Sequence, residues 1–219
     1  MKNITDAMEF YYAAMNLKNT IRQGAVQWGV KRERMEDVAS HTWGTMVLAI
    51  TLKNNLNIDV DLLKVLEMLA LHELEEVAIG DIDYFTASNM SEEERNATVA
   101  KGDNFVASIL QKLENGDYYQ DLIDDFNHGH SKEAKFARAC DKFDNVLEFK
   151  KYVDSGQVDL SHASDAMREV PRTKQFIDVG ITSLDDMWFL GNLHSYEHLG
   201  LTKEIWDNVI KPFDSSERS

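Results

Sequence analysis

The chain has 219 residues, of which 43% are hydrophobic and 28% are charged, as in a soluble globular protein of one domain, or one domain with an appendage. No run approaches the ~18 apolar residues of a membrane span, and the formal net charge of −15 disfavours binding to nucleic-acid polymers and anionic membranes. The single cysteine, Cys140, excludes an intrachain disulfide and no signal peptide is evident, so we expect a cytoplasmic protein.

The predicted elements are helices. Only two prolines are present, and no strand-like alternation runs long enough for a sheet, so we predict an all-α fold. Helices are expected over residues 7–17, 37–54, 91–113 and 132–153, with loops over residues 18–34 and 127–131. A further helix is expected from Asp59 or Asp61, either of which could cap it, to Gly80. Two or three shorter helices follow residue 156, with Pro171 and Gly180 as breaks.

The first predicted loop is basic. Its cationic residues are Lys18, Arg22, Lys31, Arg32 and Arg34. In so acidic a chain this cluster is the one place that could attract an anion such as a phosphate. An ordinary solvated loop explains the same residues, and both interpretations stay open.

Polar side chains continue the apolar face of the helix that ends at Gly80. At 100° per residue, His72, Glu73 and Glu76 extend the stripe formed by Leu62, Val65, Leu66 and Leu69, whereas Glu75 falls on the opposite side. Buried carboxylates need a cation, a proton or strong hydrogen-bond donors. A metal ion is the economical partner, because imidazole and carboxylate together form a common ligand set.

A second imidazole, His41, lies on a mostly apolar face of the helix predicted over residues 37–54. Either histidine alone is explained as a core residue; both together with inward carboxylates make a metal site an equal alternative, and both interpretations stay open. By its own helical face Asp141 is interpreted as a solvated charge, and the neighbouring Cys140 as a buried thiol. The remaining histidines are expected to be surface or local structural residues: His128, His130, His162, His194 and His198.

Three runs carry a resemblance to a known family. They are E-D-V-A-S-H at residues 36–41, L-A-L-H-E-L-E-E-V-A-I-G-D-I at residues 69–82 and E-A-K-F-A-R-A-C-D-K at residues 133–142. In this order and spacing they resemble the HD-domain superfamily of metal-dependent phosphohydrolases, and within it the YfbR-like 5′-deoxynucleotidases. The resemblance covers roughly residues 15–155. The His-Glu pair at residues 72–73 departs from the family's His-Asp pair.

The resemblance implies a fold and a site. The fold is an HD-domain helical bundle, which we place over residues 1–155. Residues 156–219 lie beyond the resemblance; their aromatic residues predict additional C-terminal helices packed on the same domain, as a cover, a lid or a subunit contact. One divalent metal ion is implied, of type Mn, Co, Fe, Ni, Zn or Mg, with His41, His72, Glu73 and Asp141 as ligands. Catalytic roles are implied for Glu76 and Asp81, and substrate contacts for Arg22 and Trp28.

The implied activity is that of a 5′-deoxynucleotidase, which hydrolyses a deoxynucleoside 5′-monophosphate to deoxynucleoside and phosphate. Two alternatives stay open: a deoxynucleoside triphosphate hydrolase, and a catalytically degenerate HD module that binds a nucleotide without turnover. The expected partners are a small nucleotide substrate and a second copy of the chain in a homodimer, with no nucleic-acid polymer and no membrane.

Overall fold

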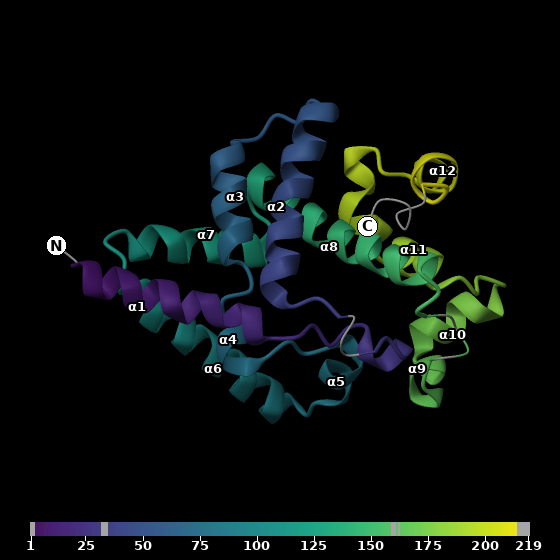
Figure 1. Cartoon of the computed structure of the whole chain (residues 1–219), viewed down its shortest axis with the longest axis horizontal. Helices are drawn as coiled ribbons and strands as arrows, with labels where there is room; N and C mark the ends of the chain where they lie inside the picture. Colours follow the sequence, from purple (N-terminus) through teal and green to yellow (C-terminus); the bar gives the residue numbers. More distant parts are fainter. Residues whose placement is uncertain (1–2, 32–34, 159–160, 162, 214–219) are drawn as a thin grey trace. The chain divides into compact units, whose positions relative to one another are not determined.

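The structure is a computed structural model that describes residues 3–31, 35–158, 161 and 163–213 (Figure 1). Within these residues the regular structure is helical, and the only β pairing is an isolated antiparallel bridge between Ile21 and Asp37. The predicted all-α fold is therefore confirmed. Among the described helices, none is both long and apolar enough to cross a membrane.

The chain divides into two compact units. The first comprises Met1–Arg22 and Glu36–Arg138, and the second comprises Gln23–Met35 and Ala139–Ser219. The boundary between them lies inside one continuous helix, α8 (Lys132–Asp154), whereas the sequence analysis placed a division at residue 155.

The first unit holds most of the helices. In chain order they are α1 (Ile4–Ala14), a 3₁₀ turn (Met15–Asn19), α2 (Val38–Asn55), α3 (Leu62–Leu71), α4 (Glu76–Ile79), α5 (Tyr84–Asn89), α6 (Glu92–Leu110), α7 (Gly116–His128) and the beginning of α8. Helix α2 packs on α3, and α3 packs on α7, while α1 and α4 both pack on α6 (Figure 1). Neither α5 nor α7 was predicted.

An apolar cluster joins several helices of the first unit, and its burial drives their packing. Its buried members come from the 3₁₀ turn, from α2, α6 and α7, and from the segment between α3 and α4: Leu17, Val38, Leu74, Val106, Ile109, Leu110 and Ile123. Because Val38 and Leu74 belong to it, the first turn of α2 and the segment after α3 are held close to the same core.

Side-chain caps fix where the helices of the first unit begin. The carboxylate of Asp37 accepts a hydrogen bond from the backbone N–H of Ser40, and Asp61 caps α3 in the same way. Ser91 and Glu94 form a reciprocal capping box at the start of α6. The predicted helix starts at these three residues are confirmed.

The predicted helix over residues 61–80 is interrupted. Helix α3 ends at Leu71, and the next residues form tight turns in which Leu74 N–H donates to Leu71 O (3.1 Å) and Glu76 N–H to Glu73 O (3.0 Å). The ring of His72 contacts the carbonyl of Leu69 at 2.8 Å, which is the carbonyl that the N–H of residue 73 would use in a continuing helix. The expectation of one continuous helical face was therefore wrong beyond Leu71.

The interruption turns Glu75 inward. The sequence analysis placed it on the outer side of the helix, but its side chain is half-buried, against α6. A Cβ added at Gly102 of α6 would lie 3.0 Å from the Cβ of Glu75, so the absence of a side chain at position 102 allows this approach. Gly80, with φ 76°, then ends α4, as the sequence predicted.

The second unit contains the rest of α8 and the C-terminal helices. These are α9 (Asp165–Glu169), α10 (Pro171–Asp178), α11 (Leu184–Tyr196), α12 (Lys203–Ile205) and a π-helical turn (Trp206–Ile210). Buried aromatic rings form its core: the ring of Phe189 stacks on Trp206 with centroids 4.6 Å apart, and the Tyr196 hydroxyl donates to the carbonyl of Phe189 at 2.6 Å. Pro171 opens α10, while Gly180 follows its end, as predicted.

Candidate metal centre

Two buried imidazoles approach each other in the first unit. His41, on α2, is fully buried, and His72, directly after α3, is 3% exposed; their ring centroids are 5.6 Å apart. The contact between His72 Nδ1 and the carbonyl of Leu69 requires the proton on Nδ1, because a carbonyl oxygen only accepts. In the neutral ring Nε2 therefore keeps its lone pair, as metal ligation through this atom requires.

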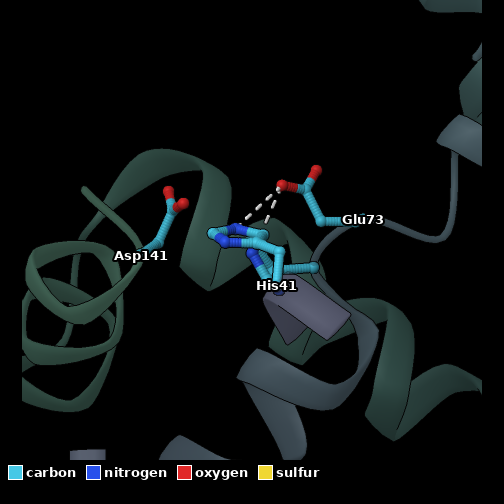
Figure 2. A group of neighbouring side chains, drawn as sticks. His41, Glu73 and Asp141 are labelled. Atoms are coloured by element: carbon cyan, nitrogen blue, oxygen red, sulfur yellow. Dashed lines mark ion pairs between the residues drawn. The ribbon is translucent and has the colours of Figure 1, made fainter. Parts of the chain in front are cut away.

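Glu73 lies between the two imidazoles. Its Oε1 atom is 3.6 Å from Nε2 of His41 and 3.4 Å from Nε2 of His72 (Figure 2). The three residues offer ligand atoms that all lie within 4.8 Å of one another. Two imidazole nitrogens and one carboxylate oxygen suit a divalent transition metal, so the residues present fit the implied ion. The structure thus brings His41, His72 and Glu73 together, and their role as metal ligands stays a prediction.

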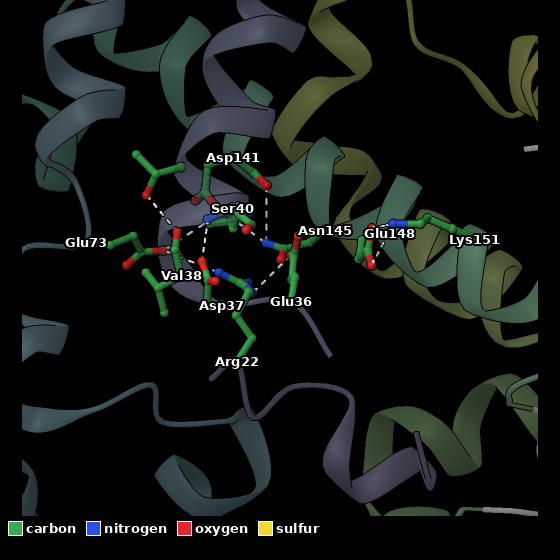
Figure 3. Close-up of polar contacts among 12 residues, drawn as sticks. Arg22, Glu36, Asp37, Val38, Ser40, Glu73, Asp141, Asn145, Glu148 and Lys151 are labelled. Carbon is green, nitrogen blue, oxygen red and sulfur yellow. Dashed lines mark hydrogen bonds and ion pairs between the residues drawn. The ribbon is translucent and has the colours of Figure 1, made fainter. Parts of the chain in front are cut away.

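A short backbone pairing places Arg22 beside this group. The N–H of Val38 donates to the carbonyl of Thr20 at 2.9 Å, and the N–H of Arg22 donates to the carbonyl of Glu36 at 3.1 Å. The guanidinium of Arg22 lies between two carboxylates, with Nε 3.6 Å from Oε1 of Glu36 and Nη1 3.7 Å from Oε1 of Glu73 (Figure 3). The segment before α2 thus brings a cation to the metal centre.

The carboxylates after Glu73 have raised pKa values. Burial, reinforced by the negative charge of Glu73, raises the pKa of Glu75 to about 7. Burial also raises the pKa of Glu76 to about 10; the charges of Glu73 and Asp81 add to this, and Arg22 opposes it. Among the residues that the structure describes, none makes a hydrogen bond with the buried Oε2 of Glu76. This oxygen of Glu76 thus lacks a compensating donor, which is the condition under which a buried carboxyl group retains a proton.

Asp81 follows Gly80 directly and is half-buried. Its charge contributes to the raised pKa of Glu76, so the two groups interact within one unit. The structure therefore brings Arg22, Glu76 and Asp81 into the surroundings of the His41–His72–Glu73 group.

Asp141 lies on α8, in the second unit. Its side chain is buried, so the interpretation as a solvated charge was wrong. Nζ of Lys142 lies 2.8 Å from its Oδ2, and Nδ2 of Asn145 donates to its backbone carbonyl at 3.2 Å (Figure 3). Its neighbour Cys140 is a buried free thiol whose pKa is raised by burial, as predicted.

Trp28 also belongs to the second unit. Its indole is 5% exposed and packs edge-on against Phe149, with ring centroids 6.4 Å apart. It is thus a core residue of that unit, and its predicted contact with the substrate stays a prediction.

The other basic residues of the first predicted loop and the later histidines are exposed wherever the structure describes them. Lys18 and Lys31 are exposed, while Arg32 and Arg34 lie outside the described residues. Four of the five later histidines are exposed, as expected: His128, His130, His194 and His198. His162 lies outside the described residues.

Sequence reasoning assigned no role to Glu36 or to the inward-facing Glu75. Glu36 stands in the E-x-V-A-x-H run but precedes α2, where helical periodicity says nothing about direction. Its contact with Arg22 depends on a pairing between segments separated by fourteen residues, from Arg22 to Glu36.

Comparisons with known proteins agree with this geometry. A family model described as HD domain matches residues 14–178. The chain is 26% identical to human 5′-deoxynucleotidase HDDC2 over 148 residues, covering 67% of this chain and 68% of that protein. It is 25% identical over 182 residues to 5′-deoxynucleotidase hdd1 of Schizosaccharomyces pombe, covering 78% of this chain and 87% of that protein.

Solved structures share the fold. A predicted metal-dependent phosphohydrolase from Magnetospirillum magnetotacticum matches with a TM-score of 0.60 and 17% identity, over 91% of this chain and 93% of that chain. An HD-domain phosphohydrolase from Listeria innocua matches with a TM-score of 0.54 and 17% identity, over 89% and 98%. The family model covers more than half of the sequence and includes every residue assigned to the centre. The chain belongs to the HD-domain family.

Proposed function

We propose that the protein is a metal-dependent phosphohydrolase that releases phosphate from deoxynucleoside 5′-monophosphates. The observation that carries this proposal is the contact of one carboxylate oxygen, Oε1 of Glu73, with Nε2 of both His41 and His72. The HD-domain family and relatives named 5′-deoxynucleotidase support the reaction type and the substrate class.

His41, His72 and Glu73 would hold the ion, with Asp141 as a fourth ligand. Asp141 offers a buried carboxylate on α8. The N-terminal part of that helix, up to Arg138, belongs to the same unit as the other three ligands, and the helix continues without a break to Asp141. A divalent cation held there would polarise a phosphoryl oxygen and neutralise Glu73, which lowers the pKa of Glu76 towards neutrality.

The remaining residues position the substrate and move protons. Arg22 pairs with the phosphate through its guanidinium, whose planar fork of N–H donors matches phosphate oxygens. Water attacks the phosphorus, and the bond between the phosphorus and the 5′-oxygen breaks. With its pKa lowered by the bound cation, Glu76 takes the proton from the attacking water, and this same proton passes through the carboxylate of Asp81 to the departing 5′-oxygen.

A second copy of the chain is the proposed partner, through α2. The exposed residues of this helix are all uncharged: Ser40, Trp43, Val47, Ile50, Thr51, Asn54 and Asn55. Trp43 is 66% exposed, and with Val47 and Ile50 it forms a stripe at helical spacing. Two copies with a net charge of −15 repel each other, so a face without carboxylates that can pair with itself supports a twofold contact there.

The dimer is tested by sedimentation velocity. We expect Trp43→Glu to give a monomer, because a carboxylate in the centre of the contact is desolvated without a partner. Val99→Glu is the matched control, since Val99 is an exposed apolar residue on α6 and should leave the dimer intact. A wild-type monomer, or loss of the dimer in both variants, would contradict the assignment to α2.

The reaction is tested by phosphate release from deoxynucleoside mono- and triphosphates, with Mn²⁺, Co²⁺, Mg²⁺, Zn²⁺ or EDTA. We expect metal-dependent release of inorganic phosphate from monophosphates by the wild type and none from Glu76→Ala. Triphosphate or pyrophosphate as the product would instead indicate a triphosphate hydrolase. Nucleotide binding without turnover, with metal bound, would indicate a degenerate module.

The reducing cytosol is the proposed compartment, supported by the free buried Cys140.

A further inference from the structure

Glu36 is the neighbour of Arg22 in the segment that precedes α2. Its Oε1 atom lies 3.6 Å from Nε of Arg22, and the two side chains are only 17% and 18% exposed. Partial burial shields the pair from water, so it is stronger than a solvent-exposed ion pair. None of the roles assigned above uses this carboxylate.

The backbone makes this contact a fixed one. Ile21 and Asp37 form the antiparallel bridge, and the two flanking hydrogen bonds join Val38 to Thr20 and Arg22 to Glu36. In this register Arg22 and Glu36 are directly opposed. Directly opposed residues of an antiparallel pair project their side chains to the same side. The carboxylate is therefore brought to the guanidinium by main-chain geometry.

The two carboxylates hold different edges of the guanidinium. Glu36 faces Nε, whereas Glu73 faces Nη1, at 3.7 Å (Figure 3). Glu73 is also the residue whose oxygen contacts both imidazoles, so its carboxylate serves the metal centre. Glu36 therefore contacts the guanidinium at the edge that Glu73 does not face.

We propose that Glu36 is a positioning residue, which holds Arg22 by its Nε edge so that the terminal nitrogens face the phosphate of the substrate. This inference rests on the proposed function, since it concerns the same phosphate. An arginine fixed in rotation loses less side-chain entropy on binding than a mobile one, and its fork is already aligned for bidentate contact. Glu36 thus acts through Arg22 and does not touch the substrate.

The test is calorimetric titration with inorganic phosphate, once with one equivalent of Mn²⁺ and once with EDTA. Four proteins are compared: wild type, Glu36→Gln, Arg22→Ala and the double variant. We expect Glu36→Gln and Arg22→Ala each to weaken phosphate binding, by about tenfold for one misplaced charge-assisted contact. The double variant should bind no more weakly than Arg22→Ala alone, because Glu36 has nothing to position once Arg22 is gone.

Two further variants separate positioning from a structural role. Glu36→Asp keeps the charge on a shorter side chain and should recover part of the lost affinity. Glu67→Gln is the matched control, because Glu67 is another carboxylate of the first unit and accepts from the Tyr118 hydroxyl at 2.7 Å, outside the centre. It should leave phosphate affinity unchanged, and all variants should keep the wild-type helical circular dichroism.

Several results would overturn the inference. They are unchanged phosphate affinity in Glu36→Gln, additive losses in the double variant, or loss of bound Mn²⁺ in Glu36→Gln, which would make Glu36 a metal ligand. Failure of the wild type to bind phosphate would overturn both this role and that of Arg22. Coupled losses of phosphate affinity support the inference even if no monophosphate is hydrolysed, so its outcome is separate from that of the proposed reaction.

Discussion

Glu75 and Glu76 lie in the same compact unit as Asp125, yet the two regions shift carboxyl pKa values in opposite directions. Burial and neighbouring carboxylates raise the pKa of Glu75 to about 7 and that of Glu76 to about 10. Burial also raises the pKa of Asp125, but hydrogen bonds from Ser131 and the nearby Lys64 ammonium outweigh it and leave the pKa below its usual value. Burial raises the pKa in both regions; neighbouring carboxylates add to this at Glu75 and Glu76, whereas hydrogen-bond donors and a cation oppose it at Asp125.

This difference separates a functional cluster from a structural one. Asp125, near the end of α7, accepts hydrogen bonds from Ser131 in the segment before α8 and from Lys64 of α3. These contacts compensate its charge. The carboxylates of Glu73, Glu75 and Glu76 lie close together, and the repulsion between them lowers the stability of the fold. A folded protein tolerates such a cost at a site that binds a cation or transfers a proton. The following predictions test this distinction, from the largest effect to the smallest.

The largest effect is expected from removing the shared ligand. We expect Glu73→Ala to lose bound divalent metal and to lower phosphate release by ~10³-fold or more, because the contact of both imidazoles with one oxygen disappears. Metal content by mass spectrometry of the desalted protein and phosphate release check this. Asp125→Asn serves as the control and should retain its metal. Equal metal loss in both variants would remove the distinction between the two regions.

A smaller change in rate, with a gain in stability, is expected for Glu76→Gln. Loss of the group that we propose takes the proton from water should lower kcat by about 10²–10⁴-fold. In the unfolded chain, Glu76 loses its proton above its ordinary pKa of 4.5. In the folded protein it keeps the proton up to about pH 10. The free energy of unfolding of the wild type in EDTA therefore falls as the pH rises through this range, by at most ~1.4 kcal/mol per pH unit. The Glu76→Gln variant has no such loss, because glutamine does not titrate.

Urea unfolding in EDTA at pH 6 and pH 8 measures this gain. The advantage of Glu76→Gln over the wild type should be larger at pH 8. An advantage that is equal at the two pH values, or a destabilised variant at both, would show that the surroundings of Glu76 do not favour its protonated form.

The smallest effect is expected at the structural carboxylate. Asp125→Asn should lower the free energy of unfolding by about 1–2 kcal/mol at pH 7, because charge-assisted hydrogen bonds are lost, and should leave kcat unchanged. Since the pKa of folded Asp125 is lowered from 3.8, its contribution is present above pH 3.8 and is lost as the pH falls below that value. The difference between variant and wild type should therefore shrink between pH 5 and pH 3. A constant difference would contradict the role of the charge.

Much of the fold and part of the site followed from the sequence because they depend on local rules. Capping residues predicted where α2, α3 and α6 begin, and the spacing of apolar residues predicted that His41 and His72 face inward. Helical periodicity failed after Leu71, where the ring of His72 takes up a backbone carbonyl, and it therefore misplaced Glu75. The burial of Asp141 and the pairing of Arg22 with Glu36 depend on contacts between distant segments, which no local pattern encodes.

Gly102 gives α6 an influence on a reaction to which it contributes no ligand. A glycine inside a helix costs about 1 kcal/mol relative to alanine, yet a methyl group at the buried position 102 would meet the Cβ of Glu75 at 3.0 Å. The resulting displacement would pass along the chain to Glu73 and Glu76, which flank Glu75 closely. A single methyl group at position 102 would therefore change the spacing between the proposed ligand Glu73 and the proposed base Glu76. Substitution in a helix outside the centre would in this way change the turnover rate.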